Sequence, residues 1–356
     1  MDSATRIAQR MATLATMGFQ RTDASVFPAE VLPVPGGRYK VTQKRPSMGT
    51  LVSITAIHVS QGQVEEAAGR AFEEMGRVVE LLNRYDPSSA ISVLNDLGII
   101  GGPPPELSGV LRQALSYHGK SLGAFDPTVL PLVDLFRSRG TLASGGATPS
   151  IPPSPEEIQD LLELVDAGAV EVTPSSIRLE KVGMGLTLDG IAKGFVVDRM
   201  AEILSALGLS DYLIDAGGDL RSSGFREDGR PWQVAVQDPG KLNRFPDVFP
   251  LTGMAVATSG SYEIYFDPSR SRHHIVDGRA GSSPQQSQSV SVVAPTAMEA
   301  DALATSVFLM EPTRALAFID SIPRCACLIL DPSGSQVRST RWRSAGEPPT
   351  PKAGTL

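Results

Sequence analysis

The sequence predicts a globular α+β protein. Segments of strand composition and helical segments follow one another along the 356 residues in a mixed order, which argues against a doubly wound nucleotide-binding fold with its parallel sheet. The chain contains no internal sequence repeat. With 41% hydrophobic and 20% charged residues, it can bury one large core or two moderate ones. Disorder throughout the chain is therefore excluded.

Overall charge and cysteine content exclude several classes of function. The formal net charge is -7 and the sequence pI is about 5.3, and no dense Lys/Arg block offsets the acidic total, so nucleic acid is not an expected partner. Cys325 and Cys327 alternate in a strand-like apolar run, which places both on one face and favours buried thiols over a metal or redox pair. A cysteine zinc site needs more ligands than this spacing offers.

The N-terminal segment is typical of a leader or flexible arm. Residues 1–38 end in a stretch rich in Pro and Gly, and the apolar stretch at 11–19 is too short and too mixed to span a membrane. Basic residues precede this weak apolar region, but it has no clear cleavage site and no lipid-accepting cysteine. We therefore expect one domain over residues 39–345, a flexible tail over 346–356 and no transmembrane segment.

The predicted domain opens with a strand and a long helix. Leu51–Ile57 has strand composition, and Val64–Leu82 has helix periodicity dominated by Ala, Glu and Leu. Three more helices are predicted after it from caps and Gly/Pro breaks: a short one from the cap Ser88-Ser89 to Leu94, one near Leu107–Leu122 and one after Pro127.

Residues 140–155 divide the domain. This segment is rich in Gly, Ser and Pro, so we expect a loop between two subdomains. Strand-like and helical segments alternate beyond it. The predicted strands are Ile177–Leu179, Leu186–Leu188, Tyr212–Asp215, Trp232–Val236, Ala255–Thr258 and Ser289–Val293, and the predicted helices are Phe195–Leu207 and Met298–Met310.

An acid and a hydroxyl lie four residues apart at the head of an apolar helix. Asp301 and Thr305 therefore share one helical face. Oxygen ligands that point the same way suit a hard cation such as Mg2+. A plain capping role for Asp301 near the helix start is the alternative, and this pair alone favours the capping role.

Three glycine-bearing turns follow predicted strands. Gly190–Gly194 precedes a helix and contains Lys193, so backbone N–H groups and an ammonium can meet a phosphate there, although the spacing is not that of a Walker loop. Asp215–Asp219 has paired glycines that permit positive φ or close approach of a ligand. Thr258-Ser259-Gly260 sets small hydroxyls beside glycine, which suits phosphate or ribose contacts. Taken alone, each is equally compatible with an ordinary turn.

His273 and His274 are half of the four histidines in the chain. Histidine is the side chain best suited to move a proton near neutral pH. Adjacent residues on a strand face opposite sides, so only one of the two can enter a given pocket. Solvent-exposed edge positions are the alternative, and the local sequence does not show which side faces inward.

Together these motifs resemble the FAD:protein FMN transferase (ApbE) family, in order from about residue 45 to residue 310. The matching motifs are Ser47-Met48-Gly49-Thr50, Tyr85 to Ser92 with Asn95, Ala124 to Thr128, Gly190 to Gly194 with Asp198, Gly217-Gly218-Asp219, Thr258-Ser259-Gly260, His274-Ile275 and Ala300 to Thr305. No single motif would suffice, but eight in one order are not expected by chance. The resemblance implies an ApbE-like fold with two packed α/β subdomains and mixed or antiparallel sheets.

The resemblance also implies roles for individual residues. Asp301 and Thr305 would hold Mg2+ together with the main-chain carbonyl of Gly190. His274 would be the catalytic, proton-handling residue, and Tyr85 would lie against the flavin ring, where an aromatic face stacks well. The residues implied to bind FAD are Met48, Tyr85, Ala124, Phe125, Asp126, Thr187, Lys193, Ser259, Gly260 and Ile275.

The chain departs from the family pattern at two places. Where many members carry an acid four residues before the isoleucine of the glycine turn, this chain has Thr187, and an acid stands instead at Asp189. This change can reshape part of the flavin or metal contact. Gly278 replaces a proline that usually follows the histidine motif, and glycine can adopt the φ of proline at an entropic cost.

The activity implied by the resemblance is Mg2+-dependent transfer of FMN from FAD. The enzyme would break the FAD pyrophosphate, release AMP and attach FMN by a phosphoester to a Thr or Ser of an acceptor flavoprotein. An FAD pyrophosphatase and a non-catalytic flavin-binding maturation protein are the alternatives; Tyr85 favours transfer over hydrolysis, while Thr187 leaves the non-catalytic role open. The resemblance implies a periplasmic, extracytoplasmic location, and the lack of a clear signal peptide leaves the cytoplasm open.

Overall fold

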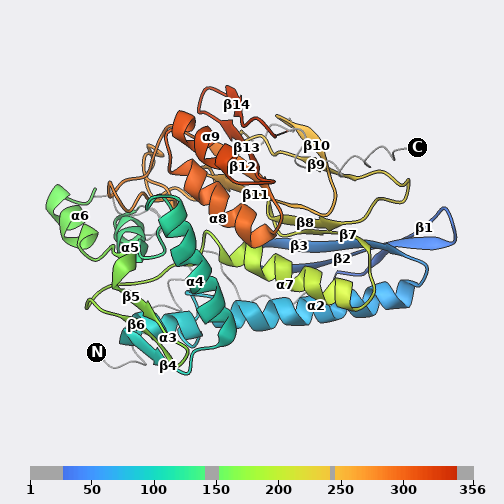
Figure 1. Cartoon of the computed structure of the whole chain (residues 1–356), viewed down its shortest axis with the longest axis horizontal. Helices are drawn as coiled ribbons and strands as arrows, with labels where there is room; N and C mark the ends of the chain where they lie inside the picture. The colour runs from blue at the N-terminus through green and yellow to red at the C-terminus, as the bar shows by residue number, and fades with distance from the viewer. Residues whose placement is uncertain (1–26, 141–151, 241–244, 343–356) are drawn as a thin grey trace, which may run out of the picture.

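The computed structural model of this chain describes residues 27–140, 152–240 and 245–342. Nine of the described strands form one antiparallel sheet (Figure 1) in the order β1-β2-β3-β7-β8-β11-β12-β13-β14. Their bounds are β1 Glu30–Val34, β2 Arg38–Ser47, β3 Thr50–His58, β7 Asp211–Asp215, β8 Leu220–Ser223, β11 Ala255–Gly260, β12 Ser289–Ala294, β13 Ala326–Leu330 and β14 Gln336–Arg338.

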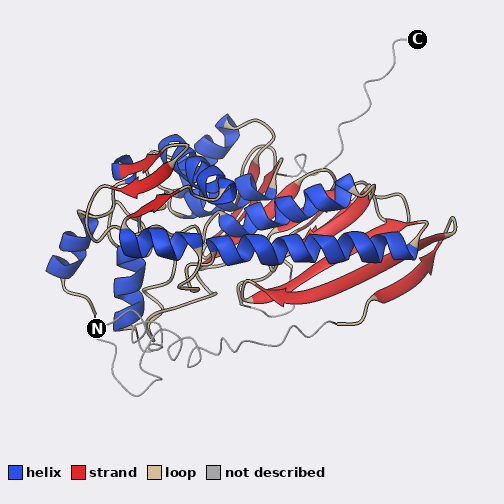
Figure 2. Ribbon diagram, turned by 90° about the horizontal axis from the view of Figure 1, so that it is seen from below, coloured by secondary structure: helices blue, strands red, loops and turns tan. Residues whose placement is uncertain are grey.

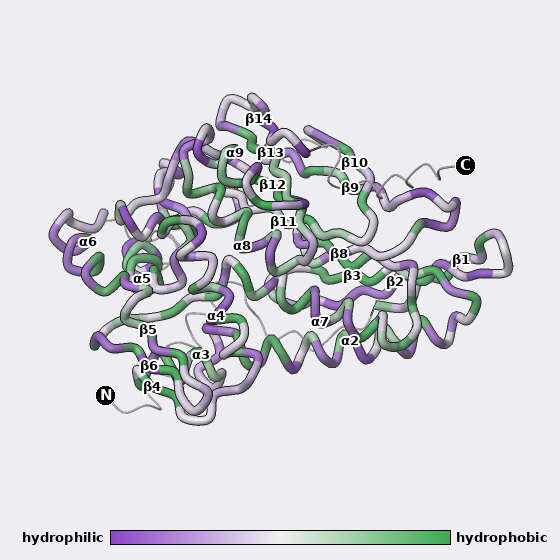
Figure 3. The backbone as a smooth tube through the Cα atoms, in the orientation of Figure 1, coloured by the Kyte–Doolittle hydropathy of each residue, from purple (hydrophilic) through white to green (hydrophobic). Residues whose placement is uncertain are grey.

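Helices cover one face of this sheet (Figure 2). They are α2 Gln61–Leu82, α7 Ala192–Ala206, α8 Ala297–Phe308 and α9 Pro312–Ser321. Helix α2 begins where the Ser60 hydroxyl accepts a hydrogen bond from the Gln63 N–H. Its buried residues recur every three or four positions from Val64 to Leu82, so the tube in Figure 3 alternates between apolar and hydrophilic along α2. No helix in the described ranges combines the length and the apolar character needed to cross a bilayer.

A small second core lies against the C-terminal strands of the sheet. Strands β9 (Trp232–Ala235) and β10 (Val248–Leu251) pair with each other, and their apolar residues join those of β11, β12 and β13. Trp342 is buried there, edge-on to Phe249 with ring centroids 5.0 Å apart. Its indole N–H donates to the Asp247 carboxylate at 2.9 Å, so its one polar atom is satisfied.

The remaining elements form the end of the molecule that carries α3 to α6 (Figure 1). Its helices are α3 Ala90–Leu97, α4 Pro105–Lys120, α5 Leu130–Arg139 and α6 Pro155–Leu162, and a short 3-10 turn spans Ala167–Ala169. A three-stranded antiparallel sheet accompanies them, made of β4 Ile99–Gly101, β6 Ser176–Leu179 and β5 Val170–Val172. The α+β class predicted from the sequence is confirmed.

Two expectations about local structure are wrong. Leu186–Leu188 is not a strand, because its backbone is bound by other partners: the Asn95 side chain bonds both the N–H and the carbonyl of Leu186, and the Thr187 N–H donates to the Pro127 carbonyl. Residues 30–38 do not belong to an arm, because β1 pairs in register with β2 from Val34↔Arg38 to Glu30↔Thr42. Residues 1–26, positions 141–151 of the predicted 140–155 loop and the tail over 346–356 lie outside the described residues.

The two cysteines are buried, as predicted. Cys327 faces the main core together with Ile329, whereas Leu328 and Leu330 face the second core. Cys325, directly before β13, also lies in the main core. Burial raises the pKa of both thiols to about 12, so they are unreactive apolar side chains at neutral pH.

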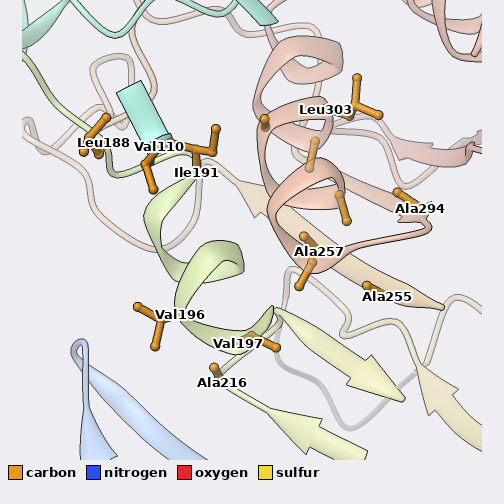
Figure 4. Packing of buried hydrophobic residues seen from close by; sticks show 14 of the residues in the cluster. Val110, Leu188, Ile191, Val196, Val197, Ala216, Ala255, Ala257, Ala294 and Leu303 are labelled. Carbon is orange, nitrogen blue, oxygen red and sulfur yellow. The ribbon is translucent and has the colours of Figure 1, made fainter. Parts of the chain in front are cut away.

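Helices α7 and α8 cross at nearly backbone contact. The Gly194 Cα lies against the Ala297 carbonyl, and a Cβ added there would also be 2.7 Å from the Met298 Cα. Small side chains beneath α8, including Ala255 and Ala257, let it lie close to the sheet (Figure 4). This crossing brings the turn before α7 next to Thr305 of α8.

The crossing predicts a stability cost at one glycine. Gly194→Ala should lower the free energy of unfolding by about 1–3 kcal/mol, because the added methyl overlaps backbone that cannot move without separating the two helices. Gly69→Ala in α2 is the matched control: nothing lies within 4 Å of its added Cβ, so helix propensity should make it neutral or stabilising by up to about 1 kcal/mol. Denaturant unfolding of both variants checks this, and equal effects would contradict it.

Candidate functional site

The turn before α7 brings three of the predicted site residues together. At Gly190 a Cβ would lie 2.8 Å from the Thr305 hydroxyl oxygen and 3.2 Å from the Phe125 ring. Only glycine lets the turn approach both side chains without displacing them. The main chain of Gly190 therefore lies beside Thr305, as the predicted set of metal ligands requires.

Asp301 and Thr305 lie one turn apart on α8. The buried Asp301 carboxylate accepts a hydrogen bond from the Gly194 N–H through Oδ2 at 3.1 Å. The Thr305 and Ser259 hydroxyls are 3.3 Å apart. The start of α8 is capped by Thr296, whose hydroxyl accepts from the Glu299 N–H. Asp301 is therefore not the cap of its own helix; it binds an otherwise unpaired N–H in the first turn of α7.

A lysine and a second acid complete this buried group of charges. Lys193 pairs with the buried Asp219 at 3.1 Å. Burial raises the pKa of Asp219, and Lys193 acts in the opposite direction. Burial and the nearby Asp219 raise the pKa of Asp301 well above its ordinary value. Two carboxylates thus share one ammonium, and the excess negative charge favours a bound cation.

The donor set at this position fits Mg2+. It combines one carboxylate, one hydroxyl and one backbone carbonyl, all hard oxygen ligands of the kind that holds Mg2+ alongside phosphate. Within the described residues Asp301 Oδ1 accepts no hydrogen bond. The same part of the chain contains no cluster of three His, Cys, Asp or Glu side chains suited to a metal. The assignment of Mg2+ stays a prediction.

Tyr85 lies partly buried between two arginines. The Arg84 guanidinium is 4.3 Å from the centre of the Tyr85 ring and donates to its hydroxyl at 2.7 Å. Arg137 donates to the same hydroxyl at 3.1 Å. The side chain of Arg84 is only 6% exposed and also donates to Asp189 at 2.8 Å. The ring orientation of Tyr85 is therefore fixed by charged partners, and its predicted role against the flavin stays a prediction.

The turn at 124–128 supplies the next group of predicted contacts. Ala124 and Phe125 are buried in the main core. Asp126 Oδ1 accepts from both the N–H and the hydroxyl of Thr128, at 2.8 and 2.5 Å. Thr187 lies beside this turn, because its N–H donates to the Pro127 carbonyl. The structure thus brings Thr187 next to the 124–128 turn, and a role of this turn in binding FAD stays a prediction.

The histidine motif is not a regular strand. His273 forms an isolated bridge with Tyr265, is buried to 1% exposure and lies edge-on to Phe308 of α8. One of its ring nitrogens, Nε2, is 2.9 Å from the Pro284 carbonyl. His274 is half-buried, with Nδ1 3.4 Å from the Ile264 carbonyl. His273 therefore faces the core. The catalytic assignment of His274 stays a prediction.

The remaining predicted contacts are Met48, Gly260 and Ile275. Met48 has φ +51 and is followed by a glycine at φ +74, the geometry of a tight two-residue hairpin between β2 and β3. Thr50, just after it, lies against Gly217. Gly260 ends β11 with Tyr262 packed where a side chain would be. Ile275 is buried in the main core.

Sequence reasoning did not identify several partners that organise the site. Arg84 and Asp189 had no local signal of pairing, since 105 residues separate them. Asp219 was part of a glycine motif without an assigned partner. Asp198 binds the N–H groups of Ala297 and Met298 at 2.9 Å each, so it caps α8 from α7; its position one helical turn after Gly194 was the available signal.

Comparisons with known proteins decide the family. The sequence profile of the ApbE family matches residues 48–329. This chain belongs to the ApbE family.

Three relatives in the ApbE family are 27–30% identical in sequence to this chain over the aligned residues. The chain is 29% identical over 285 residues to the FAD:protein FMN transferase of Haemophilus influenzae, covering 76% of this chain and 80% of the relative. It is 30% identical over 245 residues to the enzyme of the same name from Escherichia coli, covering 66% and 68%. The ApbE protein structure from Thermotoga maritima matches with a TM-score of 0.76 and 27% identity, covering 90% of this chain and 100% of the other.

The 124–128 turn predicts a contribution to stability that depends on pH. His118 Nδ1 lies 3.2 Å from Asp126 Oδ2, and this contact raises the pKa of His118. Because the folded pKa is raised, the stabilisation is complete below the ordinary histidine pKa of about 6.5 and is lost as the pH rises through the folded value. His118→Gln should therefore lower the melting temperature more at about pH 5.5 than at about pH 9. Thermal unfolding at both pH values checks this. An equal loss of melting temperature at the two pH values would show that a charged His118–Asp126 pair does not stabilise the fold.

Proposed function

We propose that this chain is a Mg2+-dependent FAD:protein FMN transferase. The observation that carries the proposal is the convergence of Asp301, Thr305 and the main chain of Gly190 next to Lys193. Membership of the ApbE family and relatives named FAD:protein FMN transferase support it. The substrates are FAD and an acceptor flavoprotein that presents a Thr or Ser hydroxyl.

The reaction is a phosphoryl transfer in which one P–O bond replaces another. The acceptor hydroxyl oxygen bonds to the phosphorus of the FMN half of FAD, and the pyrophosphate bond to the AMP half breaks. AMP leaves with the bonding electron pair, and the hydroxyl proton passes to a base of the enzyme. Such a step depends mainly on positioning and on neutralising charge, which a fixed group of oxygen ligands and an ammonium provide.

The residues at the crossing of α7 and α8 would neutralise charge on the substrate in two ways, through a bound cation and through the Lys193 ammonium. Asp301, Thr305 and Gly190 would hold Mg2+, which when bound neutralises charge on the pyrophosphate. Lys193 is kept protonated because Asp219 and Asp301 raise its pKa against the effect of burial, so its ammonium is available to a phosphate oxygen. Asp219 holds that ammonium in place from the turn between β7 and β8.

His274 is the base that we propose for the acceptor hydroxyl. Burial, and then the neighbouring His273, lower its pKa to about 4. The imidazole is therefore neutral near pH 7 and can accept a proton without first losing one. Tyr85, held by Arg84 and Arg137, would stack on the flavin ring. A periplasmic location is implied by the family resemblance alone and stays a prediction.

The proposed function is tested by mass spectrometry of an acceptor flavoprotein after incubation with the enzyme, FAD and Mg2+. Transfer adds the mass of FMN less water to one Thr or Ser and releases one AMP for each modified acceptor. Release of free FMN and AMP with an unmodified acceptor would instead assign an FAD pyrophosphatase. If no AMP is released, the protein would instead be a non-catalytic flavin-binding protein.

The metal group predicts unequal effects of two substitutions. Asp301→Ala should abolish transfer, because it removes the charged oxygen ligand and leaves the pyrophosphate charge without its cation. Thr305→Ala removes a neutral ligand and should be milder, with activity partly restored at high Mg2+. Transfer rates over a Mg2+ titration check both variants. A wild-type rate and wild-type Mg2+ dependence in Asp301→Ala would show that the metal is bound elsewhere.

The histidine pair predicts a separation of activity from stability. His274→Ala should bind FAD but lose about 10²- to 10⁴-fold in transfer rate, the usual cost of removing a positioned base. His273→Ala should instead lower the melting temperature, because it empties a buried position against Phe308, while retaining more activity below that temperature. FAD binding, transfer rate and thermal unfolding of both variants check this; full activity in His274→Ala would refute the role.

A further inference from the structure

Arg84 is a buried cation outside the predicted site residues. Its side chain is 6% exposed, and long cationic side chains are rarely buried unless they are paired. The guanidinium donates to Asp189 at 2.8 Å and to the Tyr85 hydroxyl at 2.7 Å, and lies 3.6 Å from Asp134. A planar fork with several donors can hold such partners at fixed angles, which a lysine cannot do.

Arg84 connects two parts of the site that are distant in sequence. Tyr85 comes from the segment between α2 and α3, whereas Asp189 directly precedes Gly190 in the turn before α7. One end of the guanidinium therefore fixes the predicted flavin-facing ring, and the other fixes the turn whose main chain lies against Thr305.

The rest of this turn is bound by α3 and by the 124–128 turn. The Asn95 side chain binds the N–H and carbonyl of Leu186 at 2.7 and 2.9 Å. The Thr187 N–H donates to the Pro127 carbonyl at 2.8 Å, and its hydroxyl accepts from the Asp189 N–H at 3.2 Å. Of the contacts from outside this turn, the one between Arg84 and Asp189 is nearest in sequence to Gly190. Without it, the Asp189 carboxylate loses the guanidinium that binds it, while the Asp189 N–H keeps its bond to the Thr187 hydroxyl.

We propose that Arg84, through Asp189, is a positioning residue that sets the Tyr85 ring and the Gly190 turn at a fixed separation. This inference rests on the proposed function, since it assigns the flavin to Tyr85 and the pyrophosphate to the turn. It explains how an acid at position 189, with a threonine at 187, is accommodated in this chain: the acid is bound by Arg84 and does not enter the ligand set of Asp301 and Thr305.

A positioning role differs from a purely structural ion pair in its effect on the reaction. The separation of flavin and turn decides where the FMN phosphorus lies relative to Lys193 and the acceptor hydroxyl. A misplacement of about 1 Å can cost about 10²-fold in rate. Binding of FAD depends on many contacts and should change much less. A structural role alone would lower the melting temperature without changing the rate of the folded enzyme.

The experiment compares Arg84→Gln, Asp189→Asn and the double variant with the exposed pair Arg70–Glu66 on α2, which is 61% exposed at both side chains. For each protein we would measure FAD affinity by equilibrium dialysis, flavin fluorescence per bound FAD, maximal transfer rate and melting temperature. Arg84→Lys is included because it keeps the buried positive charge but lacks the planar guanidinium with its several donors. It replaces Arg84→Gln in the comparison if that variant does not fold.

Both single variants should lose about tenfold to hundredfold in maximal rate, with a much smaller change in FAD affinity. The double variant should be no slower than the slower single variant, because both single variants already remove the same Arg84–Asp189 contact. Flavin fluorescence per bound FAD should rise as Tyr85 loses its fixed stacking. Arg70→Gln and Glu66→Gln should change none of these quantities.

Unchanged rate and fluorescence in folded Arg84 and Asp189 variants would overturn the inference, as would losses that add in the double variant. Flavin fluorescence distinguishes failure of this inference from failure of the proposed function. If the wild-type protein transfers no FMN, the fluorescence per bound FAD still compares Arg84 variants with the wild type. A rise would support the positioning of Tyr85, and no rise would refute it.

Discussion

The site depends on the crossing of α7 and α8 at Gly194. Because Gly194 has no side chain, α8 lies with its backbone against the first turn of α7. The Asp301 carboxylate can then accept the Gly194 N–H at 3.1 Å, and in the opposite direction Asp198 binds the N–H groups at the start of α8. Each helix thus caps the other, and the start of α7 is fixed relative to the face of α8 that carries the predicted ligands.

This mutual capping has an electrostatic consequence. The unpaired N–H groups at a helix start carry partial positive charge and favour nearby carboxylates. Asp301 is buried in such a place, yet burial and Asp219 still raise its pKa. The helix start therefore compensates only part of the cost of burial, and a divalent cation with Lys193 would compensate the rest. An acid retained under these conditions is typical of a functional site rather than of a core.

The network around Tyr85 shows how the chain accommodates its departure from the family pattern. Thr187 uses its N–H and hydroxyl for the backbone of the turn, and Asp189 binds Arg84. The acid at position 189 thus stays outside the predicted metal group, while Gly190 beside it keeps its contact with Thr305.

Local pattern in the sequence was enough to predict many of the elements and to propose which residues form the site. The period of α2, the Ser89 cap of α3 and the alternation of Cys325 and Cys327 depend on neighbours within one helical turn or two strand residues. The ordered motifs predicted which residues to expect near FAD and Mg2+, because glycines, hydroxyls and acids at fixed spacing reflect backbone approach and ligand chemistry.

Only the tertiary structure decided which partners these residues have. Leu186–Leu188 has strand composition, but Asn95 and Pro127 bind its backbone in place of a neighbouring strand. Which histidine faces the core was decided by Phe308 and Pro284, and the pairing of Arg84 with Asp189 spans 105 residues. The physical reason is that a sequence pattern records the periodicity of one element, whereas the pairing of buried charges and backbone groups is set by the elements that packing brings together.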